Sequence, residues 1–336
     1  MSFLPSKLTQ HLLLTYKLED MALVFCGWRG ALQDFLVGAG IAELLQRVGH
    51  LGFTAAARID KDDFARRPRV GIDEISQQFA TSKDGTRVPY FMVSKKNRVR
   101  NGKNPTLLYG YGGFEVSLTP NYSAGVGRSW LSQGGVYVVA NIRGGGEYGP
   151  RWHQAALKAD RNKAYEDFAA VAEDLIARKI TTPKHLGIQG GSNGGLLMGN
   201  MTVMYPQLFG AVVCQVPLLD MKRYHKLLAG ASWMAEYGNP DTDDWSFLKA
   251  YSPYQNVRKD VRYPPVLFTT STRDDRVHPG HARKMMARMQ DQGHDVTYYE
   301  NIEGGHGGAA NNAQSAYMSA LAYTFLKQKL FPGTEP

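Results

Sequence analysis

The sequence contains few cysteines and no long apolar run. Only two of its 336 residues are cysteine, Cys26 and Cys214, so no disulfide framework is expected and a reducing compartment is favoured. No apolar run reaches the length of a membrane span, and the N-terminus lacks the ordered charged, apolar and small-residue regions of a secretory signal. We therefore expect a cytoplasmic protein without a membrane partner. Cys214 lies in an apolar run and is expected to be a buried free thiol.

The charge balance is basic, with 39 lysines and arginines against 30 acidic residues and a net charge of +9. The one dense basic run, residues 95–103, lies between two predicted strands and contains an Asn-Gly turn signal. A solvated loop is therefore favoured over a nucleic-acid site, and no nucleic-acid partner is expected.

Strands and helices are predicted to alternate over most of the chain. This pattern predicts an α/β fold with a mostly parallel sheet and helices on both faces. Residues 1–70 carry no motif, although helical spacing is found at 41–48 and Pro68 marks a boundary, so we expect an N-terminal segment at 1–70 and one α/β domain at 71–336. The predicted strands are 74–80, 86–94, 106–108, 135–142, 186–189, 211–216, 265–270 and 296–302, and the predicted helices include 165–180, 280–290 and 313–330.

A glycine-rich turn follows the predicted strand 186–189, and its sequence is Gly-Gly-Ser192-Asn193-Gly-Gly. Strand, G-x-S-x-G turn and helix together form the nucleophile elbow of α/β-hydrolases. Such a tight turn leaves no room for Cβ atoms at Gly190 and Gly194. The Ser192 hydroxyl would then project from the sheet, and the backbone N–H of Asn193 would point at an oxyanion. The alternative is a glycine-rich turn with an idle serine.

A serine hydroxyl needs a base, and the base needs a carboxylate that orients it. In this fold the chain order is nucleophile, acid, histidine. His306 is the one histidine in a glycine-flanked loop directly after a predicted strand, and Asp274 and Asp275 follow another strand. We choose Asp274 because it is nearer the strand end. Asp275 would instead pair with Arg276 or cap the next helix.

Two further patterns resemble cofactor or metal sites. Residues 144–149 match G-x-G-x-x-G after a strand, but a dinucleotide site requires a helix to open there directly, whereas Pro150 and a polar-aromatic run follow. His278 and His281 form an H-x-x-H pair at the start of a predicted helix, and a metal role for it is not favoured. We expect no cofactor and no metal.

The sequence resembles the catalytic domain of the prolyl oligopeptidase family of serine peptidases from about residue 75 to 331. The resemblance implies an α/β-hydrolase fold with a triad of Ser192, Asp274 and His306. It also implies that the Tyr111 hydroxyl and the Asn193 N–H are the two oxyanion donors. Four stretches carry it: residues 109–114, 141–149, 190–195 and 274–277.

The resemblance further implies an aromatic pocket that stacks on a substrate proline, and flat rings suit the flat pyrrolidine. Arg276 matches an arginine that holds a substrate carbonyl. The alternative for Trp233 is a core tryptophan. The residues assigned to substrate binding are Phe114, Leu218, Trp233, Tyr237, Arg276 and Val277.

The leading prediction is a serine peptidase that cuts short peptides, preferably after proline. Residues 216–218 and 236–240 also resemble the oligopeptidase B branch, which cuts after basic residues. A carboxylesterase with the same triad and a catalytically silent fragment are the competing hypotheses. The oligomeric state stays open.

Family members carry a β-propeller before these motifs, and residues 1–70 are too few for even two blades of about 40–45 residues. If the chain is complete, we expect an open active-site mouth with weak exclusion of long substrates. The uncovered apolar rim would promote self-association, with the face at 41–48 as a candidate lid.

Overall fold

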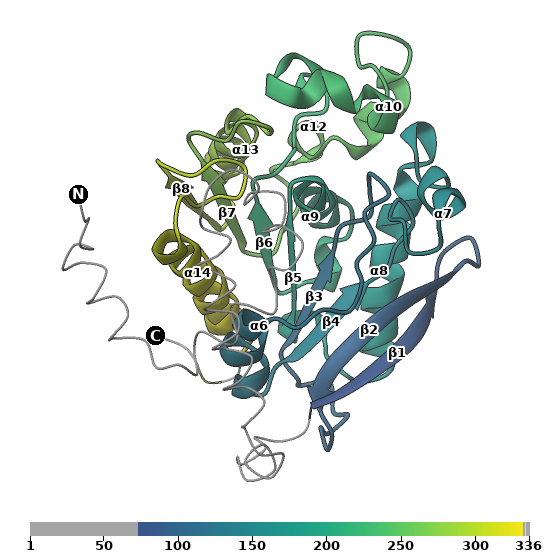
Figure 1. Ribbon diagram of the computed structural model, residues 1–336, viewed down its shortest axis with the longest axis vertical. Coiled ribbons are helices and arrows are strands. Elements are labelled where there is room, and N and C mark those ends of the chain that lie inside the picture. Colours follow the sequence, from purple (N-terminus) through teal and green to yellow (C-terminus); the bar gives the residue numbers. More distant parts are fainter. Residues whose placement is uncertain (1–72, 332, 334–336) are drawn as a thin grey trace, which may run out of the picture. The chain divides into compact units, whose positions relative to one another are not determined.

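The computed structural model describes residues 73–331 and residue 333 (Figure 1). The predicted segment 1–70, including the helical spacing at 41–48, Pro68 and Cys26, lies outside the described residues.

The described residues contain an eight-stranded sheet with the order β1-β2-β4-β3-β5-β6-β7-β8. Strand β2 pairs antiparallel with both β1 and β4, and all the other neighbouring strands are parallel. The carboxyl ends of the parallel strands therefore lie at one edge, where ligands bind in such sheets. The strands are β1 (Asp73–Thr81), β2 (Arg87–Lys95), β3 (Thr106–Gly110), β4 (Val136–Ala140), β5 (Leu186–Gly191), β6 (Ala211–Gln215), β7 (Val266–Ser271) and β8 (Val296–Asn301).

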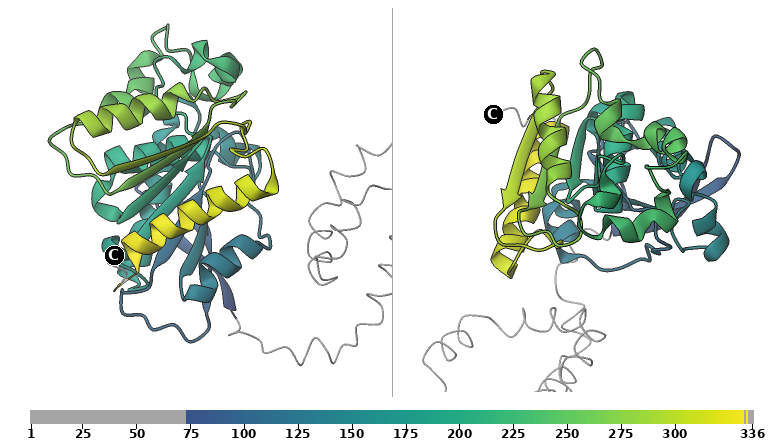
Figure 2. Two further views of the ribbon diagram at one scale, coloured as in Figure 1. Left: turned by 90° about the vertical axis from the view of Figure 1, so that its left-hand side faces the viewer. Right: turned by 90° about the horizontal axis from the view of Figure 1, so that it is seen from above.

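Helices cover both faces of this sheet, which confirms the predicted fold class. The edge strand β8 lies between α13 and α14 (Figure 2). The helices are α6 (Ala124–Ser129), α7 (Pro150–Gln154), α8 (Asn162–Ala177), α9 (Asn193–Met204), α10 (Met234–Tyr237), α11 (Trp245–Leu248), α12 (Pro253–Asn256), α13 (Gly280–Asp291) and α14 (Asn312–Leu330).

The two faces of the sheet bury separate apolar clusters. The larger cluster contains Leu108, Val212 and Phe268 from the strands, together with residues of α8, α9 and α13. Their sequence neighbours Leu107, Val213 and Leu267 belong to the second cluster, with residues of α14. Because side chains alternate along a strand, these parallel strands are apolar at consecutive positions, as a sheet covered on both faces requires.

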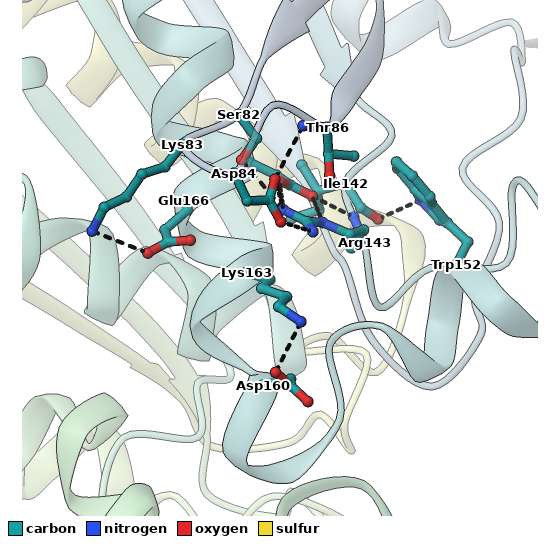
Figure 3. A network of polar contacts seen from close by, with 11 residues as sticks. Ser82, Lys83, Asp84, Thr86, Ile142, Arg143, Trp152, Asp160, Lys163 and Glu166 are labelled. Atoms are coloured by element: carbon teal, nitrogen blue, oxygen red, sulfur yellow. Dashed lines mark hydrogen bonds and ion pairs between the residues drawn. The ribbon is translucent and has the colours of Figure 1, made fainter.

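A buried arginine, Arg143, connects the β1–β2 hairpin to the rest of the fold (Figure 3). Its guanidinium lies 2.6 Å from Asp167 Oδ1 in α8 and 2.5 Å from Asp84 Oδ2 in the hairpin turn. A planar guanidinium can satisfy two carboxylates at once. Its hydrogen bond to Asp84 holds the pKa of that carboxyl well below the usual range. The network thus joins the hairpin turn, the segment after β4 and α8.

The predicted strands and main helices are present, with shifted ends. The helix predicted at 165–180 spans 162–177, because Lys179 adopts a φ of 57° and the chain leaves the helical conformation. The expectation of no helix directly after Gly149 is wrong. Pro150 occupies the first turn of the five-residue helix α7, where a backbone N–H has no partner within the helix, so its absence in proline costs nothing.

Two expectations from composition also concern the described residues. Cys214 is a buried free thiol, as predicted, and burial raises the pKa of its thiol. Among residues 73–331, no helix is both long enough and apolar enough to cross a membrane.

Candidate active site

Ser192 lies in a sharp turn between β5 and α9. Its backbone has φ of 60° and ψ of −117°, a conformation that non-glycine residues rarely adopt. Two glycines make the turn sterically possible. A Cβ on Gly190 would come within 2.6 Å of the Gly194 carbonyl oxygen, and a Cβ on Gly194 would come within 3.0 Å of the Gly110 carbonyl oxygen. The serine is therefore placed at the carboxyl end of β5 with its side chain half-buried.

The predicted acid and base are in direct contact. His306 Nδ1 lies 2.9 Å from Asp274 Oδ2 and 3.0 Å from Asp274 Oδ1. The Asp274 side chain is fully buried, and its Oδ1 accepts hydrogen bonds from the backbone N–H groups of Arg276 and Val277, both at 2.9 Å. These two donors fix the carboxylate, so that His306 presents Nδ1 to it and leaves Nε2 available.

The loops that carry Asp274 and His306 are also joined by other contacts. Asp275 is exposed, and its Oδ1 accepts the backbone N–H of His306 at 3.2 Å. Sequence reasoning placed Asp275 against Arg276 or at a helix cap, and neither predicted contact is among the hydrogen bonds of this loop. In addition, the Ser271 hydroxyl donates to the Gly304 carbonyl oxygen, which ties the end of β7 to the loop after β8.

Tyr111 follows β3, and Ser192 follows the neighbouring strand β5, so both residues lie at the carboxyl ends of adjacent parallel strands. Burial raises the pKa of Tyr111 above its usual value, and its polar neighbours oppose this shift only in part. The phenol therefore stays protonated at neutral pH and can donate a hydrogen bond. The residue after the serine, Asn193, begins α9, so its backbone N–H is one of the free donors at a helix N-terminus.

The Asn193 side chain lies in a buried polar network that the sequence did not predict. Its Nδ2 donates to the Tyr111 carbonyl oxygen at 2.6 Å, and its Oδ1 accepts from Arg161 and from the Tyr237 hydroxyl. Arg161 is 1% exposed and pairs with Glu236 at 2.9 Å. In the sequence, Arg161 lies in a polar stretch typical of a solvated surface, so it gave no signal of burial.

The residues assigned to the substrate pocket differ in exposure. Phe114 and Trp233 are half-buried and Arg276 is exposed. Tyr237 is fully buried, and its ring contacts the Phe114 ring edge-on at 5.5 Å between centroids. Leu218 and Val277 are also buried. Within the described residues, Phe114, Trp233 and Arg276 therefore reach the surface, whereas the other three assigned residues do not. The buried Tyr237 ring packs against Phe114.

The H-x-x-H pair and the glycine-rich loop at 144–149 both make close contacts with other parts of the fold. His281 is buried, and its Nδ1 accepts the backbone N–H groups of Leu219 and Asp220. Burial lowers the pKa of His281 to about 4. The glycine-rich loop packs closely on the segment after β3, since a Cβ on Gly144 would lie 2.4 Å from the Gly112 carbonyl oxygen. No group of three or more potential metal ligands occurs in the part of the chain that the structure describes.

The fold and the elbow define an α/β-hydrolase, and the comparisons with known proteins identify its family. The profile of the prolyl oligopeptidase family matches residues 122–332. An uncharacterized peptidase of Sinorhizobium fredii is 57% identical over 257 residues, which cover 76% of this chain and 35% of that protein. A prolyl endopeptidase of Elizabethkingia miricola is 42% identical over 236 residues, or 68% of this chain and 33% of that protein.

A solved structure of a post-proline cleaving enzyme from Rickettsia typhi superposes with a TM-score of 0.76 at 45% identity, covering 77% of this chain and 38% of that one. The chain therefore belongs to the prolyl oligopeptidase family. The matching region spans about a third of the length of the curated relatives, 35% and 33% in the two above.

Proposed function

We propose that this chain is a serine peptidase that uses Ser192 as nucleophile, His306 as general base and Asp274 as the residue that orients the base. The observation that carries the proposal is the buried Asp274 carboxylate, held by two backbone N–H groups at 2.9 Å and contacting His306 Nδ1 at the same distance. This contact keeps the proton of neutral His306 on Nδ1 and leaves Nε2 as the acceptor. An ion pair that only stabilised the surface would need neither a buried carboxylate nor two backbone donors that fix it.

In the proposed reaction, Ser192 Oγ attacks the scissile carbonyl carbon as His306 Nε2 takes the hydroxyl proton. The tetrahedral oxyanion accepts hydrogen bonds from the Asn193 N–H and the Tyr111 hydroxyl. His306 then gives its proton to the leaving amine and the C–N bond breaks. Water, activated by the same histidine, hydrolyses the acyl-enzyme and restores the serine.

We propose further that the enzyme cuts short peptides after proline. The relatives from Elizabethkingia miricola and Rickettsia typhi carry names that describe proline-directed cleavage. In this chain, Phe114 and Trp233 are half-buried, so each leaves part of an aromatic ring exposed, and such a surface suits a flat ring. Glu236, an acidic group near them, is already paired with Arg161 and His153, so it offers no free carboxylate to a basic substrate side chain.

A panel of chromogenic peptides that differ only in the residue before the scissile bond tests this specificity. With Pro, Arg and Ala at that position, we expect kcat/KM to be highest for Pro, and Ser192→Ala provides the background for each peptide. A preference for Arg would contradict the proline assignment while leaving the serine mechanism intact. No turnover of any peptide above that of Ser192→Ala would contradict the peptidase itself.

A further inference from the structure

A buried ion pair lies directly beneath the proposed oxyanion site. Arg161 is 1% exposed and Glu236 is 4% exposed, and their side chains are 2.9 Å apart. Burial alone would lower the pKa of Arg161, but the surrounding tyrosines and the Glu236 carboxylate raise it above its usual value. The guanidinium is therefore a fixed positive charge within the fold, and neither residue belongs to the triad or to the proposed pocket surface.

The guanidinium connects this ion pair to the oxyanion donors through one amide. One terminal nitrogen of Arg161 bonds Glu236 and the other donates to Asn193 Oδ1 at 2.5 Å. The same Oδ1 accepts the Tyr237 hydroxyl at 2.7 Å, while Asn193 Nδ2 donates to the Tyr111 carbonyl oxygen at 2.6 Å. Two donors on Oδ1 and a carbonyl acceptor on Nδ2 allow only one orientation of the amide.

Glu236 extends the network to the pocket wall. Its Oε1 accepts the backbone N–H of Phe114 at 2.9 Å, and its Oε2 lies 2.7 Å from His153 Nε2 in α7. Phe114 has a φ of 54°, a strained conformation that needs support from its surroundings. The chain also packs tightly here, since a Cβ on Gly113 would lie 2.5 Å from Asn193 Nδ2 and 2.9 Å from the Arg161 guanidinium.

We propose that Arg161, held by Glu236, is a positioning residue for the oxyanion site, acting through the Asn193 side chain on both proposed donors. The inference rests on the proposed function and adds a residue to it. The Asn193 amide joins the backbone that carries its own N–H donor to the backbone that carries Tyr111. When Arg161 fixes this amide, it fixes the distance between the two donors, on which stabilisation of the tetrahedral intermediate depends.

Geometry makes arginine suited to this task, and lysine less so. A guanidinium presents its donors in a rigid fork, so that one side chain can bond Glu236 and Asn193 in fixed relative positions. An ammonium group keeps the charge but lacks the fork. Arg161→Lys therefore separates the loss of orientation from the loss of charge, and Arg143→Lys is a matched control. Arg143 is also buried between carboxylates, at 4% exposure, and its hydrogen bonds run to Ser82, Asp84 and Asp167 rather than to Asn193.

The test measures kcat and KM for a proline peptide and the inhibition constant of a matched peptidyl trifluoromethyl ketone. The ketone forms a tetrahedral anionic adduct with an active serine, so its affinity reports the oxyanion site. For Arg161→Lys we expect kcat to fall about 10–100-fold with KM little changed, because displacing a reacting group by about 1 Å can cost about 100-fold. The ketone should weaken by the same factor as kcat/KM. Arg143→Lys should lower Tm but leave kcat essentially unchanged.

A double-mutant cycle tests whether the effect passes through Asn193. In an Asn193→Ala background, Arg161→Lys should lower kcat no further. If Arg161→Lys does not fold, as judged by circular dichroism, Tyr237→Phe removes a donor from the same Oδ1 without leaving a buried charge. We expect it to lower kcat as well, and again only when Asn193 is present.

An unchanged kcat in folded Arg161→Lys would contradict the inference but not the proposed function. If only Tyr237→Phe folds, an unchanged kcat in that variant has the same meaning. Additive effects in the cycle, or a Tm loss without weakened ketone binding, would also contradict the inference. A wild-type chain that neither cuts peptides nor binds the ketone would contradict the proposed function, and the inference with it.

Discussion

Replacing Asp274 by asparagine exchanges one carboxylate oxygen for an NH₂ group and should nearly abolish turnover. The backbone N–H groups of Arg276 and Val277 both donate to Oδ1 at 2.9 Å, so the asparagine carbonyl oxygen must occupy that position. The amide NH₂ then takes the place of Oδ2, which lies 2.9 Å from His306 Nδ1. Oδ1 lies 3.0 Å from Nδ1 but already accepts two backbone N–H groups, so the new NH₂ donor favours an Nδ1 that accepts. The favoured tautomer of neutral His306 then carries its proton on Nε2, the nitrogen that must take the proton from Ser192.

The size of the effect follows from the loss of the tautomer protonated on Nδ1. The analogous replacement in a trypsin-type triad lowers kcat by about 10⁴, which equals about 5.5 kcal/mol of barrier. The neighbouring residue provides the control. Among residues 73–331, the Asp275 carboxylate accepts one hydrogen bond, from the backbone N–H of His306 at 3.2 Å, and an asparagine oxygen can accept the same bond. Asp275→Asn should therefore keep most of the activity.

The assay is steady-state hydrolysis of a proline peptide by both variants, with Tm measured to verify folding. We expect a loss on the order of 10⁴ for Asp274→Asn and a small change for Asp275→Asn. The reverse order of effects in folded proteins would refute the assignment of the acid and the argument from the two backbone donors.

Three further outcomes are expected. Trp233→Ala should lower kcat/KM for proline peptides more than for a small activated ester, since a stacked aromatic contact contributes about 0.5–1.5 kcal/mol beyond its area; equal losses for both substrates would indicate a core tryptophan. The pKa of His281 is lowered from 6.5 to about 4, so the unfolded state takes up a proton at a higher pH than the folded state does. The free energy of unfolding should therefore fall by about 3 kcal/mol as the pH drops from 6.5 to about 4. Urea titrations should show this loss in wild type and a flatter profile in His281→Gln. Gly190→Ala should cost about 1–3 kcal/mol of unfolding free energy, because its Cβ would meet the Gly194 carbonyl oxygen at 2.6 Å, and an unchanged urea midpoint would contradict that contact.

Local sequence patterns were sufficient for the elements that depend on local physics. The strands could be predicted from the sequence because a sheet covered on both faces needs consecutive apolar residues, as at 211–215. The elbow could be predicted because Gly190 and Gly194, two residues before and after Ser192, leave little room for a Cβ. The ends of elements were less readable. Helix α8 ends where Lys179 adopts a positive φ, and nothing in the residue type of a lysine predicts that conformation.

Contacts between distant segments could not be predicted in the same way. Arg161 and Glu236 are 75 residues apart. Arg161 occurs in a polar stretch typical of a surface, whereas Glu236 lies among the apolar and aromatic residues 233–237. Asp275 was placed by its nearest neighbours in sequence, whereas its partner is the backbone of His306, which comes from another loop. Tyr237 was assigned to the pocket by resemblance, and its burial depends on how α10 packs beneath Phe114.

The central claim is that Ser192 is an activated nucleophile in the folded chain. A fluorophosphonate probe tests it directly, because the probe reacts with a serine only when a base and an oxyanion site activate it. Intact mass and peptide mapping should show one adduct, on Ser192, in folded wild-type protein, and none in heat-denatured protein or in Ser192→Ala. Folded wild-type protein that stays unlabelled, or that is labelled at another residue, would contradict the account.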